Sequence, residues 1–419
     1  MIAATGDWLT RAPLPSPATD RGFAGVIDVV RSASLGLTTL EENLLDEKKI
    51  PPLDASGTVR WPYGTKSTAD DLRRVGMTVV SLANNHAIDY GAEGMGQTKQ
   101  ILDREGLRIV GIGESLDQAQ APVFLGTSPR RVAIIAVSTS ASAESRATHS
   151  RGEILGRPGV NVLRYSPDVT VDPATFAILQ RSPIATASGN HDQLTLSGTT
   201  IKKGAHTKVE FVPNNDDLRE ILAQVRLARS ESDEAIVMLH SHEPDNQSSA
   251  PADFVQSFAR ALIDAGASIV VGTGPHRLRG IELYKSGAIF YSLGNFTFDY
   301  SAIDRRSADV YESGADLYQL ALGALGSASN FAVPQSSESI WWQSVIALTT
   351  LDRGALKSIR LRPIDLGTDM PPARRGIPII ASAQRAGEIL QRLADLSRAC
   401  GTEILIRNGQ GEVQLDKSR

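Results

Sequence analysis

The sequence predicts an α/β fold in which central, mostly buried β-sheets lie between helices. Short apolar runs alternate along the chain with amphipathic segments, and glycines stand where several of these segments pass into the next apolar run. Polar residues recur where the apolar runs end. Alternation of strand and helix is typical of sheets covered by helices, so we expect a layered α/β architecture.

The predicted strands are short apolar runs, and the predicted helices carry apolar residues on one face. We expect strands over residues 2–5, 37–40, 77–82, 107–112, 132–137, 235–239, 268–271 and 288–292. Helices are expected over residues 68–75, 97–104, 216–228, 251–265 and 384–398. Gly76, Gly106 and Gly266 follow helices and precede strands, where glycine readily adopts the left-handed conformation that ends a helix.

The periodicity over the 419 residues indicates a single domain with two additions. Residues from about 138 to 213 are rich in Ser, Thr, Arg and Gly, so we expect an irregular insertion there. A second irregular segment is expected over residues 301–339. Residues from about 380 to 419 are expected to form a helix and a hairpin, with Asn408-Gly409 or Gln410-Gly411 at the turn.

Charge and cysteine content exclude several classes of protein. The net charge is −4, and no long basic run occurs, which argues against a general nucleic-acid binder. The single cysteine, Cys400, excludes an intramolecular disulfide and a cysteine-based zinc site. No secretory signal and no run of about 18 apolar residues is visible. We therefore expect a cytoplasmic protein without a membrane anchor.

Residues suited to metal binding occur at the carboxyl ends of six predicted strands. They are Asp7, Glu41, Asn85 with His86, His240, His276 and Asn295. Ligands of open α/β sheets bind outside the carboxyl ends of the strands, so we expect these side chains to converge. Carboxylate and amide oxygens and imidazoles suit Zn²⁺, Mn²⁺ or Fe²⁺, and a bridging carboxylate can hold two ions. Ser241-His242-Glu243 can add acid/base or supporting groups.

Each of these residues also has an ordinary structural explanation when it is taken alone. Asp7 suits a turn after a glycine, Glu41 suits a solvated helix start, and residues 84–86 suit a helix cap. A lone His240 suits a hydrogen-bonded structural histidine. Their recurrence at successive strand ends favours a metal site.

A second string of the same kind lies in the predicted insertion. Residues 188–192 read Ser-Gly-Asn-His-Asp, but only a short apolar run, residues 184–187, precedes them. Asn85-His86 follows a much stronger strand. We therefore expect His191 to lie outside the metal cluster.

Five segments resemble a known family in order and spacing. They are "TGDW", "TTLEENL", "SLANNHAIDYGAEGMGQT", "MLHSHEPD" and "GTGPHRLRGIELYKSGAIFYSLGNFTFD". Together they resemble the CapA/PgsA family, named for poly-γ-glutamate capsule biosynthesis, over about residues 1–300. That family looks like a branch of the calcineurin-like metallophosphatase superfamily, so the resemblance implies a metallophosphatase-like α/β/β/α fold.

The resemblance implies a role for each residue that matches a family motif. Metal ligands are implied at Asp7, Glu41, Asn85, His240 and His276, which would hold one or two divalent ions. Acid/base roles are implied at His86, His276, Asp7 and Glu243.

Three positions depart from the expected pattern. Trp8-Leu9 stands where ordinary phosphoesterases have the histidine of "DxH", and Thr273 stands where many relatives have the first histidine of "GHGPH". Thr39 replaces the asparagine of "NLE". These departures weaken the expectation of simple phosphatase activity.

We expect a metal-dependent enzyme that hydrolyses or transfers an amide of a peptide or γ-glutamyl substrate. A metal-assisted peptide epimerase is the alternative, because lasso-peptide epimerases are related members of the family. A non-catalytic component of a polymer-synthesis complex is the third possibility. Arg146, Arg151, Arg164 and Asn295 are expected to bind an acidic substrate, because arginine binds carboxylates through two hydrogen bonds. For the arginines, a solvated loop is the alternative.

Overall fold

The computed structural model describes residues 1–10, 12–49, 51, 54–57, 60–187, 190–299, 339–367, 369–371 and 374–415. The irregular segment expected over residues 301–339 lies outside this range except for Ser339. Contacts divide the chain into two compact units. The larger unit is Met1–Val162 with Leu222–Arg419, and the smaller unit is Leu163–Ile221.

The first sheet of the larger unit has ten strands within the described residues, in the order β24-β25-β22-β21-β1-β2-β5-β6, with β20 beside β1 and β23 beside β22. Its central strands β1, β2, β5 and β6 run parallel. The bounds are β1 (Ile2–Leu9), β2 (Leu35–Leu40), β5 (Val79–Ser81), β6 (Arg108–Val110), β20 (Asn295–Phe298), β21 (Gln343–Asp352), β22 (Ala355–Asp365), β23 (Ile379–Ile380), β24 (Ile404–Arg407) and β25 (Gln410–Val413).

The second sheet has six described strands in the order β18-β19-β17-β16-β9-β8. Its strands β9, β16, β17 and β19 run parallel. The bounds are β8 (Val123–Leu125), β9 (Val132–Ser138), β16 (Glu234–His240), β17 (Ile269–Thr273), β18 (Ile281–Tyr284) and β19 (Gly287–Phe290). Two short pairs join β3 (Asn43–Leu44) to β4 (Tyr63–Gly64) and β7 (Ile112–Gly113) to β10 (Gly159–Val160).

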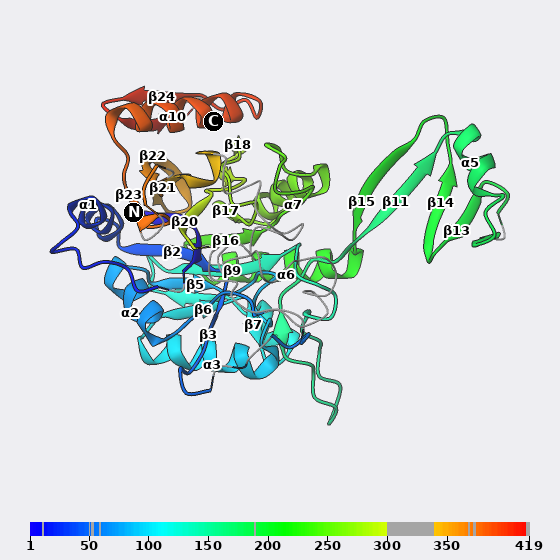
Figure 1. The fold of residues 1–419 in the computed structure, drawn as a ribbon, viewed down its shortest axis with the longest axis horizontal. Coiled ribbons are helices and arrows are strands. Elements are labelled where there is room, and N and C mark those ends of the chain that lie inside the picture. The colour runs from blue at the N-terminus through cyan, green and yellow to red at the C-terminus, as the bar shows by residue number, and fades with distance from the viewer. Residues whose placement is uncertain are drawn as a thin grey trace, which may run out of the picture. The chain divides into compact units, whose positions relative to one another are not determined.

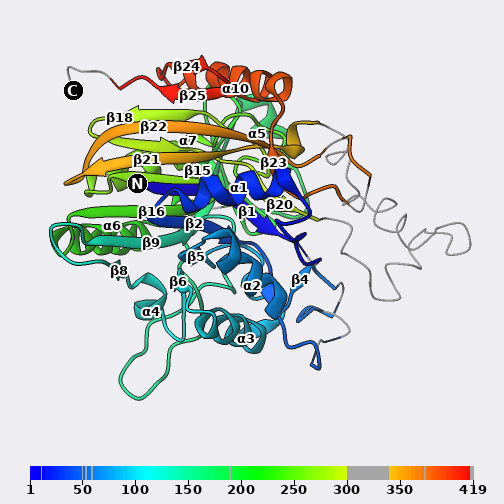
Figure 2. The same ribbon diagram turned by 90° about the vertical axis from the view of Figure 1, so that its left-hand side faces the viewer.

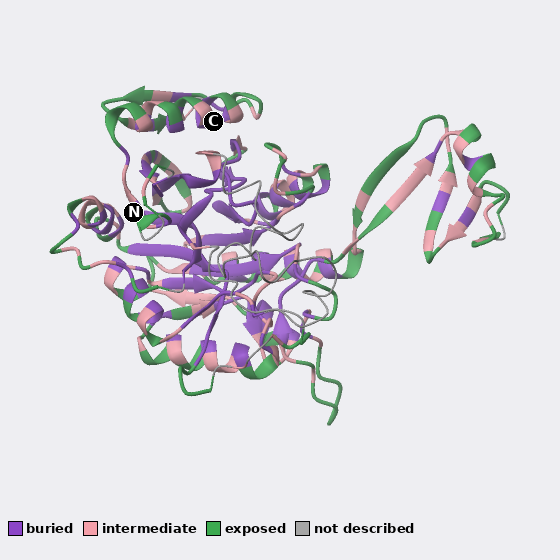
Figure 3. Cartoon of the chain, in the orientation of Figure 1, coloured by how far each residue is buried: buried purple, intermediate pink, exposed green. Residues whose placement is uncertain are grey.

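The two sheets share one apolar core. Leu37 and Val79 of the first sheet belong to the same buried cluster as Ile236 and Ile269 of the second, and Figure 3 shows these strands as the buried centre of the unit. Helix α7 (Asp253–Asp264) packs on β17 and β19, and α10 (Ala383–Arg398) packs on β18 and β22. Figures 1 and 2 show helices on the outside of the strands. The predicted layered α/β class is therefore confirmed.

Four of the described helices of the larger unit overlap predicted ones, whereas the helices Arg21–Arg31 and Leu116–Gln120 were not predicted. The described helices are α1 (Arg21–Arg31), α2 (Lys66–Val75), α3 (Gly91–Arg104), α4 (Leu116–Gln120), α7 (Asp253–Asp264) and α10 (Ala383–Arg398), while α6 (Asn215–Ser230) crosses the boundary between the units. The C-terminal hairpin β24–β25 turns at Asn408-Gly409, where both residues have positive φ angles. Gln410-Gly411, the other turn considered, lies in β25.

Two strand predictions need correction. The strand expected over residues 107–112 is split into β6 and β7, because Gly111 between them has a φ of 93° that a continuous strand cannot contain. Strand β1 extends to Leu9, so Asp7 lies inside the strand and does not follow it.

The smaller unit has regular structure where an irregular insertion was expected. It contains β11 (Tyr165–Val171), α5 (Pro173–Leu179), β12 (Ala185–Ala187), β13 (Gln193–Leu196), β14 (Thr199–Lys203) and β15 (Lys208–Pro213). The strands form one sheet in the order β12-β13-β14-β11-β15. Its core is small, built on Val171, Phe176, Leu194 and Ile201. With so few buried positions, the strands have little of the apolar alternation that reveals a strand in a sequence.

Within the described part of the chain, no helix combines the length and the apolar character needed to cross a bilayer.

Candidate metal centre

Residues from both sheets of the larger unit meet where parallel strands end. Asp7 lies in β1 where its pairing with β2 changes register, and Glu41 directly follows β2. His240 is the last residue of β16, and His276 comes three residues after β17. The carboxyl ends of both sheets thus bring together residues that are far apart in the sequence.

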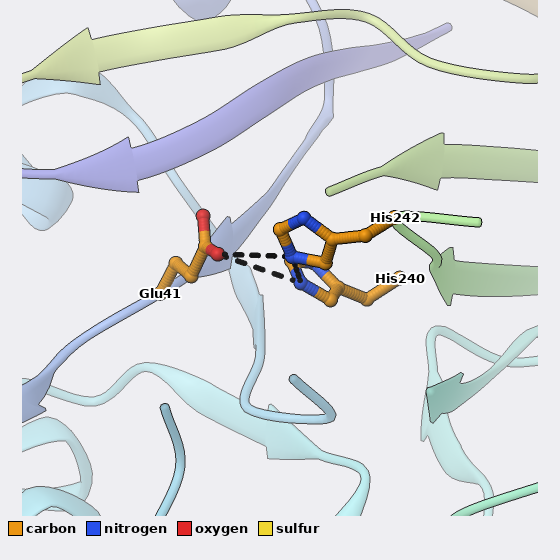
Figure 4. A group of neighbouring side chains, drawn as sticks. All are labelled: Glu41, His240 and His242. Atoms are coloured by element: carbon orange, nitrogen blue, oxygen red, sulfur yellow. Dashed lines mark hydrogen bonds and ion pairs between the residues drawn. The ribbon is translucent and has the colours of Figure 1, made fainter. Parts of the chain in front are cut away.

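Two overlapping groups of side chains could each hold a metal ion. The ligand atoms of Glu41, His240 and His242 lie within 4.8 Å of one another, and so do those of Asp7, Glu41 and His276. Glu41 Oε1 is 3.5 Å from Nε2 of both His240 and His242, and Figure 4 shows the three side chains pointing toward one another. Glu41 Oε2 lies 3.6 Å from His276 Nδ1. Glu41 is therefore placed as a bridge between the two groups.

The carboxylates at this centre are buried without enough hydrogen-bond donors. Asp7 Oδ2 accepts a hydrogen bond from the Gly274 N–H at 2.8 Å. Asp7 Oδ1 and both carboxylate oxygens of Glu41 are buried and have no hydrogen-bond partner. Burial raises the pKa of Asp7, and burial together with the charge of Asp7 raises the pKa of Glu41 well above its ordinary value. Because such oxygens are costly to bury, the arrangement fits a bound cation.

The ring nitrogens of His240 and His242 are oriented for ligation. His242 Nδ1 lies 2.7 Å from Asn246 Oδ1, and His240 Nδ1 lies 3.1 Å from Thr273 Oγ1. These oxygens can accept a proton from Nδ1, which leaves both Nε2 atoms with free lone pairs. Burial lowers the pKa of both imidazoles, which keeps them neutral.

Asn85 faces the same point through its side-chain oxygen. Its Oδ1 lies 2.8 Å from His240 Nε2 and 3.2 Å from His242 Nε2. A carboxylate oxygen, an amide oxygen and two imidazole nitrogens therefore surround one position. This mixture of donors is typical of Zn²⁺, Mn²⁺ or Fe²⁺ sites.

His276 is held in an unusual conformation by its neighbours. Its φ is 56°, a left-handed value that costs free energy for a residue with a Cβ. Asn295 Oδ1 lies 2.9 Å from His276 Nδ1, while the amide of Asn295 donates to the carbonyls of His276 and Trp341. Burial lowers the pKa of His276 to about 3. Substrate binding by Asn295 stays a prediction, and these hydrogen bonds favour a role in positioning His276.

His86 forms a dyad with Asp89 beside the centre. His86 Nδ1 lies 2.7 Å from Asp89 Oδ2. The ring of Trp61 packs edge to face against the imidazole, with 5.0 Å between the ring centroids. Burial alone would lower the pKa of His86, but the charge and hydrogen bond of Asp89 and the charge of Glu41 outweigh it, so that the pKa is raised. His86 is therefore favoured as a proton donor.

Glu243 follows His242 in the chain, and its carboxylate accepts hydrogen bonds from several hydroxyl groups. These are donated by Thr139 at 2.6 Å, Ser241 at 2.7 Å and Ser140 at 3.0 Å. Burial raises its pKa, but these hydrogen bonds outweigh the effect, and the pKa is lowered. The acid/base role predicted for Glu243 remains untested, and its contacts favour a structural role in the loop.

The three arginines predicted to bind substrate lie in different settings. Arg164, in the smaller unit, forms two hydrogen bonds of 2.8 Å with the buried carboxylate of Asp217. In the larger unit, Arg151 is exposed, and partly buried Arg146 donates to the Ala147 carbonyl. Substrate binding by all three stays a prediction, and for Arg164 the ion pair with Asp217 is a competing role.

The described residues of the second candidate motif, which spans residues 188–192, do not belong to either of the two candidate metal groups. His191 is exposed in the smaller unit, and neither candidate metal group within the described residues includes it. Gly189 of that motif lies outside the described residues.

His242 was not among the predicted ligands, although residues 241–243 were expected to support the centre. The available indication was its spacing, two residues after His240. Thr273 contacts His240 Nδ1 and donates a hydrogen bond to Thr39 Oγ1 at 3.2 Å. Thr39 and Thr273, two of the positions expected to depart from the family pattern, therefore contact each other beside His240. His242 Nε2 lies 3.1 Å from Nε2 of the same histidine.

Comparison with known proteins identifies the family. Residues 1–300 match the family described as bacterial capsule synthesis protein PGA_cap. The uncharacterized protein y4sH of Sinorhizobium fredii is 36% identical over 441 residues, which cover 99% of this chain and 93% of that protein.

Two further relatives match a shorter part of the chain. The capsule biosynthesis protein CapA of Bacillus anthracis is 30% identical over 234 residues, which cover 56% of this chain and 43% of CapA. A probable polyglutamine synthesis accessory protein of Mycobacterium tuberculosis is 28% identical over 226 residues, which cover 54% and 46% of the two chains. On the match over residues 1–300, this chain belongs to the PGA_cap family of bacterial capsule synthesis proteins.

Proposed function

We propose that this chain is a metal-dependent enzyme that hydrolyses or transfers an amide of a γ-glutamyl or other peptide-like substrate. The observation that carries the proposal is the set of three buried oxygens, Asp7 Oδ1 and both oxygens of Glu41, which have no hydrogen-bond donor. They face imidazole nitrogens that burial keeps neutral. Unpaired anionic oxygens opposite neutral nitrogens are the donor set of a cation site.

The proposed site has two positions that share Glu41. Glu41, Asn85, His240 and His242 would hold an ion at one position, and Asp7, Glu41 and His276 would hold an ion at the other. A divalent ion bound there would polarise the carbonyl of the amide and lower the pKa of a water molecule. The donor types fit Zn²⁺, Mn²⁺ or Fe²⁺.

Besides binding a metal ion, side chains of this protein would donate a proton and orient the metal ligands. His86, whose pKa is raised, would donate a proton to the leaving amine while Asp89 orients its ring. Asn295 fixes the ring of His276 through Nδ1 and its backbone through the carbonyl. These contacts are made within the protein, so the site is arranged before substrate binds.

The substrate class is supported by what the relatives are named for and by one structural feature. One relative is named for capsule biosynthesis and another for polyglutamine synthesis, and polyglutamine is a polymer joined by amide bonds. Leu9 stands where phosphoesterases of the expected type have a ligating histidine, and it packs into an apolar cluster with Phe298 and Trp341. The site therefore has no imidazole at that position, which favours a carbonyl over a phosphoryl group as the reacting group.

The proposal is tested by assaying the metal-loaded protein on γ-glutamyl oligomers, on other peptides and on p-nitrophenyl phosphate. We expect release of a new amine and little phosphate release, with Glu41→Gln as the inactive control. Run in D₂O, the same assay detects the alternative reaction, because deuterium entering an α-carbon without a new amine identifies an epimerase. Efficient phosphate release, or no turnover of any substrate by fully loaded protein, contradicts the proposal.

A further inference from the structure

The loop that carries His242 has little apolar packing of its own. It connects β16 to α7, and the residues at positions 244, 245, 247, 249 and 250 are exposed. His240, by contrast, is the last residue of a buried strand. The position of His242 therefore depends on polar contacts between this loop and the rest of the fold.

Arg279 supplies four of those contacts from a distant part of the chain. Arg279 is 0% exposed and lies in the segment of the chain that connects β17 to β18. The guanidinium donates to the carbonyls of His242 at 3.2 Å, Glu243 at 2.8 Å, Asp245 at 2.9 Å and Ser248 at 3.3 Å.

A guanidinium has five N–H donors in a fixed planar arrangement, so bonds to four carbonyls fix both the path and the orientation of the loop. One of the four carbonyls belongs to His242 itself. Two further contacts orient this residue. Its N–H donates to Ser140 Oγ at 2.7 Å, and its Nδ1 contacts Asn246 Oδ1 in the same loop.

We infer that Arg279 is a positioning residue that holds His242 as a metal ligand, an inference that rests on the proposed function. Among the four proposed ligands at this position, Arg279 forms a hydrogen bond only with His242, through its backbone carbonyl. Groups that hold ligands in this way commonly change metal affinity by about 10–100-fold when they are replaced. Loss of Arg279 should therefore weaken metal binding without removing a ligand.

The first test measures the loop itself and needs no metal. Arg279→Met keeps the aliphatic stem and removes the donors, and hydrogen exchange should then increase selectively in residues 241–252 of the metal-free protein. Arg260→Met is the matched control, because Arg260 pairs with Glu282 at 2.9 Å and has no hydrogen bond to this loop among those the structure describes. If exchange in residues 241–252 is the same in Arg279→Met as in wild type, the inference is overturned and the proposed function is unaffected.

The second test measures coupling between Arg279 and His242. Co²⁺ affinity and visible spectrum are compared in wild type, Arg279→Met, His242→Ala and the double variant. We expect Arg279→Met to weaken Co²⁺ binding about 10-fold or more, and to add little once His242 is already alanine. Additive losses would show a general structural role and overturn the inference. Wild-type protein that binds no metal would overturn the proposed function and this ligand role together.

If Arg279→Met does not fold, Arg279→Lys carries the same tests. Lysine keeps the charge but cannot reach four carbonyls from one nitrogen. Increased exchange in residues 241–252 and weakened Co²⁺ binding are again expected, and wild-type values for both would overturn the inference.

Discussion

Nε2 of His240 and Nε2 of His242 lie 3.1 Å apart, with Glu41 Oε1 3.5 Å from each. The other nitrogen of each ring is already beside an acceptor, Thr273 Oγ1 or Asn246 Oδ1. The Nε2 lone pairs of both rings therefore face the same oxygen, Glu41 Oε1. This geometry is the one that a cation shared by the three side chains requires.

The first prediction concerns the contribution of His242. His242→Ala removes one of four donor groups from its position, so the affinity for Zn²⁺ should fall by about 10-fold or more, while thermal stability of the metal-free protein changes little. Isothermal titration calorimetry on metal-free protein measures the affinity. His149→Ala is the control, since His149 pairs with Asp117 and belongs to neither metal group. Equal affinities for His242→Ala and wild type would exclude His242 as a ligand.

The second prediction concerns Glu41 and pH. The folded-state pKa of Glu41 is raised, so the metal-free folded protein binds this proton more tightly than the unfolded chain does. The protonated carboxyl group therefore adds to the free energy of unfolding at a pH below the ordinary glutamate pKa. This contribution is lost as the pH rises through the pKa that Glu41 has in the folded protein. Relative to Glu41→Gln, metal-free wild type should therefore become less stable as pH rises above about 4.5.

Urea unfolding of both proteins over a pH series measures this difference in stability. The buried histidines titrate in the opposite sense, but they are present in both proteins, so their contribution cancels in the comparison. Saturating metal should reverse its sign, because the ion binds the ionised carboxylate of wild type and not the amide of the variant. A stability difference that is independent of pH, with and without metal, would show that Glu41 is not buried as a carboxylate at a cation site.

The sequence predicted which residues converge because strand ends are marked by clear apolar runs. Asp7, Glu41, Asn85, His240 and His276 meet within the described structure as expected. His242 could not be chosen as a ligand, because its direction depends on a loop path that Arg279 fixes from 37 residues further along the chain.

Other features also depended on contacts between distant residues. The sequence suggested an acid/base role for Glu243. In the structure its carboxylate accepts hydrogen bonds from the hydroxyls of Thr139 and Ser140, about 100 residues earlier in the chain. The strands of the smaller unit escaped prediction for a different reason. Edge strand β15 (Lys208–Pro213) has no buried residue, and so it lacks an alternating apolar pattern.

The third prediction concerns proton donation by His86. His86→Ala should reduce kcat by about 10²–10⁴-fold and leave metal content unchanged. Asp89 raises the pKa of His86, so Asp89→Asn should lower that pKa and shift the loss of activity at alkaline pH to a lower pH. The pH dependence of kcat for amine release measures the shift. An unchanged alkaline limb in Asp89→Asn would mean that His86 is not the acid.

The fourth prediction separates two roles for the arginines. Arg164→Gln leaves the carboxylate of Asp217, which is 1% exposed, without its ion-pair partner. Because the Arg164 side chain is 42% exposed, we expect a modest loss of about 1–2 kcal/mol in chemical denaturation, and no change in KM. Arg151→Gln is the exposed control and should leave stability unchanged. A raised KM in Arg164→Gln at unchanged stability would instead support substrate binding.

The measurement that tests the central claim most directly is the metal content of purified protein by inductively coupled plasma mass spectrometry. Wild type and Glu41→Gln are stripped with chelator, reloaded with Zn²⁺, Mn²⁺ or Fe²⁺ and desalted side by side. We predict that wild type retains at least one divalent ion per chain and that Glu41→Gln retains much less. Wild type at the background level for all three metals, or a Glu41→Gln content equal to wild type, would contradict the assignment of Glu41 and its neighbours as a metal centre.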